Sequence, residues 1–394
     1  MKDVQTVLEA YRAAQQSQIP CALATVVSVD GSAYRRPGAR MLVYADGRRF
    51  GSLSGGCLEA DVAAHALQTL ETGKPKTVRY DPNHANGDVI LETGCKGSIG
   101  ILVEPVARLD TASSLVFLSQ VFHGRHAGMM ATVFEVEGST KVHAGDRLMI
   151  SSKFQPVAGA LCASPLADSI VHDAAVIQGN GRAAVSSYAL PEGTVHVLLE
   201  TLRPPVALVI CGAGHDTVPL AKIATAMGWL VTVADSNGAA LTAERYPDVP
   251  SLLPIPPACL TAHLSPDSRT AAVIMTHRYN LDMEWFRELL PSAMTYLGVL
   301  GPRRRWRQMQ VDLAAGGDVF SEQDIARVHS PAGLDIGSET PEEIAMAIVA
   351  EIQAVMAARS GGFLRNRDVA MHIEGRENTS SSSLAFELGG ACPL

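Results

Sequence analysis

Residues 206–217 read VALVICGAGHDT. A continuous apolar run, residues 206–211, is followed by two glycines, Gly212 and Gly214, with one residue between them. Such a run is typical of a strand buried on both faces in a parallel sheet. Residues 218–227 then have helical spacing, and residues 230–234 read as a second strand. The order strand, glycine turn, helix and strand predicts a Rossmann-like, doubly wound parallel sheet that begins near residue 205.

Gly212 and Gly214 lie between the first strand and the helix, where a phosphate-binding turn belongs in such a sheet. Thr217 stands where the fingerprint has its third glycine, so the motif alone has medium specificity. Asp235 follows the second strand, 23 residues after Gly212. In Rossmann folds a carboxylate at this position binds the ribose hydroxyls of the nucleotide, and its charge disfavours the 2′-phosphate of NADP. We expect Gly212, Gly214 and Asp235 to bind a nucleotide or another phosphate. The alternative is a Rossmann-like fold with an unused crevice.

Two later strand ends of this region also carry polar side chains. The first is Thr276-His277, and the second is the segment 301–305, whose three arginines open a predicted helix. Arginine can hold a phosphate through two hydrogen bonds, and histidine exchanges protons near neutral pH. We therefore add Arg303 and His215 to the candidate phosphate site. A solvated helix start and ordinary hydrogen-bonded histidines are the alternatives.

The clearest linker is Arg203-Pro204-Pro205. It predicts an α/β domain over residues 1–202 and a Rossmann-like domain over 203–366, whose last helix starts with a capping box at Thr340. The serines and glycines of residues 367–394 predict a disordered tail.

An internal repeat with an offset of 107 runs through the first 202 residues, with copies at about 5–108 and 112–202. The second copy is about 11 residues shorter before its closing strand. We interpret what both copies share as scaffold and what one copy alone keeps as a candidate site. A decayed repeat whose differences only tune packing is the alternative. The repeated residues include Ala24-Thr25-Val26 with Ala131-Thr132-Val133, Gly38 with Gly145, and Arg40 with Arg147.

Only the first copy has the glycine loop, residues 51–57 (GSLSGGC), which runs directly into a predicted helix. The second copy has Cys162-Ala163-Ser164 opposite Gly55-Gly56-Cys57. Gly55 and Gly56 let the backbone approach a ligand closely, and a helix N-terminus favours negative charge. Cys57 is therefore well placed to act as a soft metal ligand or as a nucleophile. The alternative is a glycine turn that ends in a buried cysteine.

A second cysteine loop, Gly94-Cys95-Lys96-Gly97, has no counterpart in the second copy. The ammonium of Lys96 favours a thiolate at Cys95. If the two loops converge, Cys57 and Cys95 surround an anionic, sulfur-compatible ligand. The remaining cysteines have no metal-binding spacing: Cys21, Cys162, Cys211, Cys259 and Cys392.

Composition excludes some classes of function. A net charge of −8 and a pI near 5.8 argue against nucleic-acid binding, which requires a basic face. The chain has no apolar run of 18 residues and no signal peptide at its start, so we expect a soluble, cytoplasmic protein without membrane contact. With 47% hydrophobic residues it can bury substantial cores.

Six segments of the sequence together form a specific pattern: 24–27, 31–39, 51–59, 211–216, 300–303 and 331–337. Through these segments, and over residues 5–366, the sequence resembles the XdhC/CoxI family of accessory factors for molybdenum hydroxylases such as xanthine dehydrogenase. One departure is Lys96, which stands where the family's second cysteine loop has a glycine.

The resemblance implies that the protein binds molybdenum cofactor, as molybdopterin or its dinucleotide form, and protects it during sulfuration. It also implies delivery of the cofactor into an apo molybdenum hydroxylase, with a cofactor sulfurase as a second partner. On this reading Cys57 is the main contact with the metal or its sulfur ligand, Cys95 is the second, and Gly55 and Gly56 shape the pocket.

Two other readings stay open. One is an NAD-dependent oxidoreductase that uses the Rossmann domain, which makes NAD a further candidate cofactor. The other is a degenerate, purely interacting relative, to which only Lys96 points. A cofactor-binding maturation factor is favoured over a catalyst, and a homodimer is the expected assembly.

Overall fold

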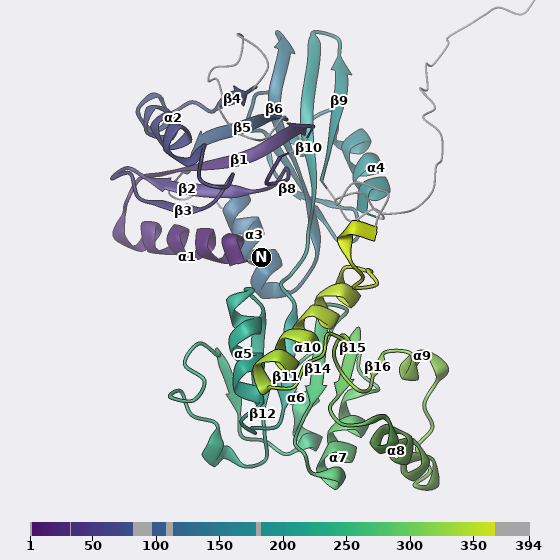
Figure 1. Cartoon of the computed structure of the whole chain (residues 1–394). Helices are drawn as coiled ribbons and strands as arrows, with labels where there is room; N and C mark the ends of the chain where they lie inside the picture. The colour runs from purple at the N-terminus through teal and green to yellow at the C-terminus, as the bar shows by residue number, and fades with distance from the viewer. Residues whose placement is uncertain (1, 32, 82–96, 108–112, 179–182, 367–394) are drawn as a thin grey trace, which may run out of the picture. The chain divides into compact units, whose positions relative to one another are not determined.

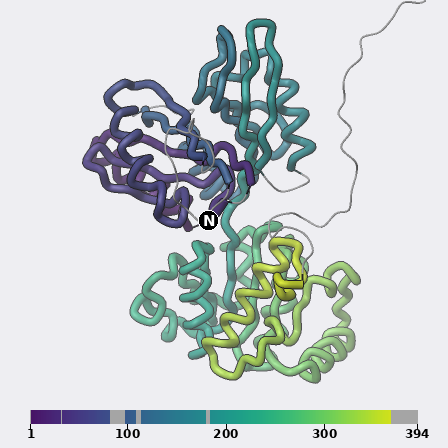
Figure 2. Tube along the Cα trace, turned by 45° about the horizontal axis from the view of Figure 1, so that its top comes forward, coloured from purple at the N-terminus to yellow at the C-terminus, as the bar shows by residue number. Residues whose placement is uncertain are grey.

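The computed structural model describes residues 2–31, 33–81, 97–107, 113–178 and 183–366. The described residues up to Ser360 form one compact unit. This unit contains three β-sheets. Figure 1 shows them with the helices that flank them, and Figure 2 shows the course of the chain from a second direction. Cys95, its neighbour Lys96 and the tail from residue 367 lie outside the described residues.

The first sheet is built around β1, whose first seven residues are all buried. Its strand order is β3-β2-β1-β5-β4, and every neighbouring pair is antiparallel. The elements of this half are α1 (Lys2–Ser17), β1 (Cys21–Asp30), β2 (Arg40–Tyr44), β3 (Arg49–Gly51), α2 (Glu59–Thr72), β4 (Lys76–Tyr80) and β5 (Ser98–Pro105).

The second sheet repeats this topology, with the order β8-β7-β6-β10-β9 and again only antiparallel pairs. A 3-10 turn, η1, takes the place of the glycine loop before its helix. The elements are α3 (Ser114–Gly124), β6 (Gly128–Gly138), β7 (Arg147–Ser151), β8 (Pro156–Ala158), η1 (Ala160–Ala163), α4 (Ala167–Gln178), β9 (Ala184–Leu190) and β10 (Gly193–Leu202).

The helices cover these sheets in equivalent ways. The apolar side of α2 packs on one face of the first sheet, and that of α4 on one face of the second. The other faces contribute to a shared core with α1 and α3. Between the two sheets lies a small cluster with residues from both halves: Val27, Leu102, Phe134 and Leu198.

Two reciprocal ion pairs cross between the halves. Arg40 in the first half donates to Glu200 in the second at 2.7 Å, and both side chains are at most 5% exposed. Arg147, the repeat equivalent of Arg40, pairs with Glu104, the equivalent of Glu200. Each arginine also donates to the carbonyl two residues before it. The halves therefore hold one another through a repeated, two-way contact.

This arrangement predicts unequal effects for equivalent glycines. Gly38 and Gly145 both have positive φ, so alanine is strained at either position. At Gly38 the added methyl would also overlap the Glu200 carboxylate, whereas at Gly145 it meets the Pro75 side chain at 3.2 Å. We expect Gly38→Ala to lose about 1–2 kcal/mol more unfolding free energy than Gly145→Ala, measured in urea. Equal losses would contradict this.

The third sheet is parallel throughout, with the order β13-β12-β11-β14-β15-β16. Helices α5 and α10 pack on one face, and α6, α7 and α8 on the other. The predicted α/β class with a doubly wound parallel sheet is confirmed. The elements are β11 (Ala207–Cys211), α5 (Thr217–Ala226), β12 (Leu230–Ala234), η2 (Gly238–Ala240), β13 (Ser251–Leu253), η3 (Pro257–Cys259), α6 (Leu260–His263), β14 (Thr270–Ile274), α7 (Tyr279–Leu289), β15 (Tyr296–Val299), α8 (Arg303–Ala315), α9 (Glu322–Ile325), β16 (Val328–His329) and α10 (Pro341–Met356).

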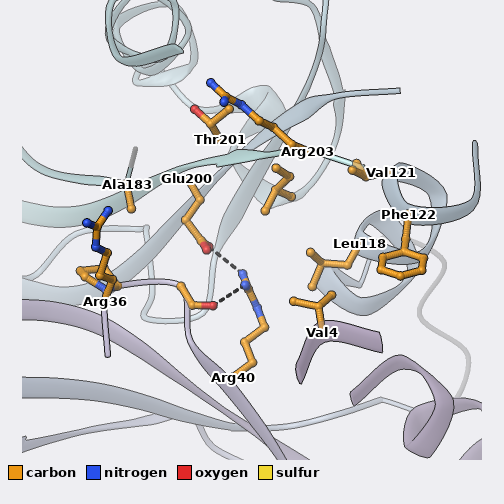
Figure 3. Close-up of a pocket in the computed structure, with 13 residues that line it drawn as sticks. Val4, Arg36, Arg40, Leu118, Val121, Phe122, Ala183, Glu200, Thr201 and Arg203 are labelled. Carbon is orange, nitrogen blue, oxygen red and sulfur yellow. Dashed lines mark hydrogen bonds and ion pairs between the residues drawn. The ribbon is translucent and has the colours of Figure 1, made fainter. Parts of the chain in front are cut away.

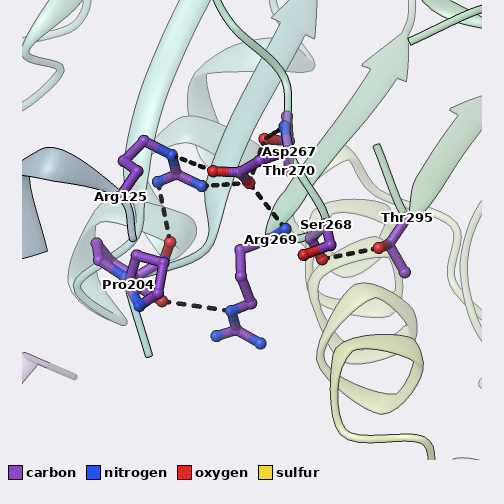
Figure 4. A network of polar contacts seen from close by, with 8 residues as sticks. Arg125, Pro204, Asp267, Ser268, Arg269, Thr270 and Thr295 are labelled. Atoms are coloured by element: carbon purple, nitrogen blue, oxygen red, sulfur yellow. Dashed lines mark hydrogen bonds and ion pairs between the residues drawn. The ribbon is translucent and has the colours of Figure 1, made fainter. Parts of the chain in front are cut away.

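The linker is held by polar contacts on both sides, which Figure 4 shows. Arg125, just after α3, makes a double hydrogen bond to Asp267 at 2.7 and 2.8 Å and reaches the Pro205 carbonyl at 3.1 Å. Arg269 donates to the Pro204 carbonyl at 3.3 Å. The linker prolines are therefore fixed by hydrogen bonds to their carbonyls. Among the described helices none is long and apolar enough to span a membrane.

Candidate functional site

The glycine loop connects β3 to α2, and both its ends are anchored in the core. The side chains of Leu53 and Leu58 are at most 1% exposed, whereas Gly55, Gly56 and Cys57 are exposed. The buried leucines fix the loop, and the segment between them carries the Cys57 thiol at the surface. The structure therefore excludes the alternative of a buried cysteine in a glycine turn.

The carboxylate of Glu59, the first residue of α2, organises this loop. Its Oε1 accepts hydrogen bonds from the backbone of Leu53 at 3.1 Å and of Ser54 at 2.9 Å, and from the Ser52 hydroxyl at 3.0 Å. Its Oε2 accepts from the Ser54 hydroxyl at 2.6 Å and from the Leu58 backbone at 3.2 Å. One side chain thus binds both ends of the loop.

The hydroxyl of Ser54 extends this network to Cys57. Ser54 Oγ accepts from the backbone of Gly56 and of Leu58, each at 3.2 Å, and the Cys57 thiol lies 3.5 Å away with donor geometry. Partial burial raises the pKa of Glu59, but the hydrogen bonds from Ser54 and Ser52 outweigh it and lower that pKa to about 2. Glu59 is therefore an anion throughout the physiological range.

In the second half the polar network is replaced by apolar side chains. Leu161 and Leu166 stand at the positions of Ser54 and Glu59, and both are at most 5% exposed. This half keeps the sheet and the helix but lacks the acceptors that organise the loop. The exposed Cys162 therefore has no equivalent of the Glu59 network around it.

An aromatic side chain lies beside the loop. Tyr34 is 70% exposed, and its ring is 4.0 Å from the point where a Cβ of Gly55 would stand. The neighbouring Arg35 forms an ion pair with Asp3, which connects the segment that carries Tyr34 to helix α1. Cys57 and an exposed ring are thus presented on adjacent segments.

A second group of polar residues lies at the carboxyl ends of β11 and β14. The chain passes from β11 to β12 on one side and returns through β14 on the other, so this edge is the topological switch point of the sheet. Gly212 has φ +127°, and a Cβ there would stand 2.9 Å from the Met275 carbonyl oxygen. Only glycine lets these two loops approach so closely.

The two loops meet through a histidine and a carboxylate. His277 Nε2 lies 2.7 Å from Asp216 Oδ2, and the His277 backbone has φ +58°, which a non-glycine residue rarely adopts. His215 is exposed beside Asp216. Of the two histidines, it is His277 that forms the pair.

Asp235 and Arg303 have different surroundings. Asp235 is 6% exposed, accepts a hydrogen bond from the Asn237 backbone at 2.7 Å and lies 3.6 Å from the Arg278 guanidinium. Arg303 is exposed at the first position of α8, while Arg305 is tied to the buried Asp282. The candidate carboxylate therefore already has a cationic neighbour.

Comparison with known proteins gives matches along most of the chain. The model of the XdhC and CoxI family matches residues 14–81, and that of the XdhC Rossmann domain matches residues 208–352. A probable xanthine dehydrogenase subunit from Bacillus subtilis is 31% identical over 359 residues, which cover 89% of this chain and 97% of that protein.

The chain belongs to the XdhC and CoxI family.

Two further relatives extend the comparison for this member of the XdhC and CoxI family. A molybdenum cofactor insertion chaperone of Escherichia coli, PaoD, is 24% identical over 90% of this chain and 89% of its own. The crystal structure of a xanthine dehydrogenase from Bacillus halodurans matches with a TM-score of 0.69 and 26% identity, and the match covers 91% of this chain and 97% of that one.

For the candidate site residues of this XdhC and CoxI family member, the structure gives two separate groups. Gly55, Gly56 and Cys57 lie on one loop, and among the described residues the side-chain hydrogen bonds of this loop stay within it and with Glu59. Gly212, Gly214, His215 and Asp235 lie at the switch point of the parallel sheet. The convergence of Cys57 with Cys95 stays a prediction. In the part of the chain that is described, no three His, Cys, Asp or Glu side chains gather as a metal site.

The sequence reasoning missed Glu59, Asp216 and Arg278 as members of these groups. A signal for Glu59 was present, because the repeat replaces both Ser54 and Glu59 by leucine. The pairs His277–Asp216 and Arg278–Asp235 join residues 61 and 43 positions apart, and nothing in a single sequence marks such pairs.

Proposed function

We propose that this protein binds molybdenum cofactor as cargo and delivers it to an apo molybdenum hydroxylase. The observation that carries the proposal is the exposed Cys57 on a loop that Glu59 and Ser54 organise, in the one half that has this network. The names of two relatives, one a probable part of a xanthine dehydrogenase and the other a cofactor insertion chaperone, support the same role.

The chemistry of the loop suits the cargo. A thiolate is a soft ligand, appropriate for a metal that already carries sulfur ligands. We propose that Cys57 contacts the metal or its sulfur ligand, that Gly55 and Gly56 allow close approach, and that the Tyr34 ring stacks on the pterin. Cys95 is proposed as the second thiol. The cofactor is held reversibly, because a carrier must release it to its partner.

We further propose that the switch-point crevice binds the phosphate end of the cofactor or a nucleotide. Gly212 and Gly214 would admit the phosphate, and Arg303 and His215 would add positive or hydrogen-bonding groups. Asp235 would bind ribose hydroxyls. NAD stays a candidate for the same crevice, a cofactor sulfurase a candidate partner, and a cytoplasmic homodimer the proposed form of the protein.

The test is retention of molybdenum by the full-length protein. Anaerobically purified protein is mixed with equimolar molybdenum cofactor, and bound metal is measured by mass spectrometry after gel filtration. We expect the wild type and Cys162→Ala to retain metal and Cys57→Ala to bind at least about tenfold more weakly, since one metal–thiolate contact is lost. Cys162 is the matched control because it is the exposed cysteine of the other half.

Two outcomes would overturn the proposal. Equal retention by Cys57→Ala and the wild type would remove the thiolate from the site. Failure of the wild type to retain any metal would count against the carrier role, and NAD titration of the same sample would then test the oxidoreductase alternative.

A further inference from the structure

Strand β9 forms one outer edge of the second sheet, where Figure 1 shows it beside its neighbour β10. It extends over seven residues, Ala184–Leu190, and pairs with β10 along its whole length. Among the described residues, its backbone makes no hydrogen bond on the side away from β10. Since N–H and C=O groups of alternate residues in an edge strand point outward, β9 presents a row of unpaired donors and acceptors.

The sequence of β9 gives this edge none of the usual protection. Natural edge strands are kept very short, or carry charged residues or proline, which prevent pairing with another chain. The residues AVSSYAL of β9 include neither a charge nor a proline. The other described edges follow the rule: β3, β8, β13 and β16 have at most three residues each, and β4 contains Lys76 and Arg79.

The internal repeat shows that this lack of charge is specific to the second half. The equivalent strand of the first half is β4, which pairs with β5 in the same register as β9 pairs with β10. Ala184 stands at the position of Lys76, and Ser187 at that of Arg79. Arg79 forms an ion pair with Glu135 of the second half, so β4 uses its charge within the chain. The edge of the second half lacks both charges.

Helix α4 leaves the outer edge of β9 open. It packs mainly on β6 and β10, the strands further inside the sheet. Its Asp173 accepts a hydrogen bond from the Tyr188 hydroxyl at 2.7 Å, which identifies the side of the helix that faces β9. Val176, nearly one turn further along that side, is 61% exposed. An apolar side chain therefore stands free beside the edge.

The opposite face of β9 is open as well, beyond its first residues. The first half reaches the start of the strand, where Ala183 and Arg36 line a cavity of about 260 Å³, drawn in Figure 3. Further along the same face, Val185 is 44% exposed, and Ser187 and Ala189 are exposed too. A second strand can therefore approach the edge without displacing a part of the chain that the structure describes.

We propose that β9 pairs antiparallel with β9 of a second copy of this chain, which joins the two second sheets into one continuous sheet. A two-fold axis at Ser187, the midpoint of the strand, brings every residue of β9 into the pairing. The inference rests on the homodimer of the proposed function and does not depend on cofactor binding.

The residues of β9 suit a second copy as the occupant. With the axis at Ser187, each larger side chain faces a smaller one: Val185 lies opposite Ala189 of the second copy, and Tyr188 opposite Ser186. The residue on the axis lies opposite itself, and a charge there would meet its own like. Serine at this position, where the first half has arginine, removes that repulsion.

The oligomeric state of the full-length protein tests this interface, measured by sedimentation equilibrium over roughly 1–100 µM. We expect the wild type to form a dimer and Ser187→Lys to weaken it about fivefold or more, because two ammonium groups then face each other across the axis. Val157→Lys places the same charge on β8, the other edge of the same sheet, and should leave the dimer unchanged. Urea unfolding of each variant checks that the fold is retained.

Charge reversal separates pairing at Ser187 from a general loss of stability. Ser187→Glu should weaken self-association as Ser187→Lys does, and an equimolar mixture of the two variants should recover the dimer, since opposite charges then meet. A mixture that associates no more tightly than either variant alone would overturn the interface. So would a wild-type dimer that Ser187→Lys leaves unchanged, although the homodimer itself would stand. A monomeric wild type would overturn both, while molybdenum retention tests the carrier role separately.

Discussion

Replacing Arg40 by methionine is expected to lower the unfolding free energy by about 3–5 kcal/mol, because the Glu200 carboxylate then stays buried without its partner. Both side chains are at most 5% exposed, so water cannot take over the role of the guanidinium. Arg147→Met, which breaks the equivalent pair with Glu104, is expected to have a comparable effect. The measurement is urea unfolding followed by circular dichroism.

Two controls sharpen this experiment. Arg48→Met breaks the exposed pair with Asp46 and is expected to leave the unfolding midpoint close to that of the wild type. The double variant Arg40→Met with Glu200→Leu should recover most of the loss, because it removes the stranded charge together with its partner. A loss for Arg40→Met no larger than that for Arg48→Met would show that the buried pair does not hold the halves together.

Replacing Glu59 by glutamine is expected to loosen the glycine loop by about 2 kcal/mol, which is roughly 30-fold in the rate of amide hydrogen exchange. The carboxylate accepts five hydrogen bonds, and an amide offers a single acceptor oxygen while its NH₂ group faces donors. The backbone amides of Leu53, Ser54 and Leu58 report the change. Glu71→Gln, an exposed carboxylate near the end of the same helix, is the control.

The same network predicts a pH dependence. The pKa of Glu59 is lowered from 4.5 to about 2, so the folded state favours the ionised form. The stabilisation from this group is fully present above about pH 4.5 and is lost as the pH falls toward 2. Protection of the loop amides in the wild type should follow this range and should be independent of pH in Glu59→Gln. Loss of protection in the wild type between pH 7 and 5 would contradict this assignment.

The parallel sheet was predictable because its strands are continuous apolar runs, and residues 206–210 and 230–234 can hardly form anything but buried strands. The short strands β13 and β16 were not expected, since three and two residues carry no periodic pattern. In the candidate site the sequence indicated the exposed Cys57 through the difference between the copies. Glu59 was missed because a side chain that accepts hydrogen bonds from its own loop has no characteristic spacing, and the one signal for it was the pair of leucines in the second copy.

The residues at the switch point also show which parts of a site can be predicted from a sequence and which cannot. Gly212 and Asp235 were placed on the correct strand ends by the order of strand and helix. That Arg278 stands beside Asp235, and that His277 meets Asp216, depends on how closely β11 and β14 lie in space. Pairs of this kind become visible only when the fold is known. The role of Cys95 and the division of the chain at residue 203 stay predictions.

The crossed pairs Arg40–Glu200 and Arg147–Glu104 also bear on how this chain can change during evolution. Each half supplies the carboxylate that the other half's arginine needs, as the two copies in a symmetric dimer do before their genes are joined. The second half can therefore lose its loop chemistry, as Leu161 and Leu166 indicate. Its deletion would still leave Arg40 and Glu104 without their partners and would expose apolar residues of the first half, such as Val27 and Leu102, to water. It persists as an obligatory neighbour while the first half carries the thiol.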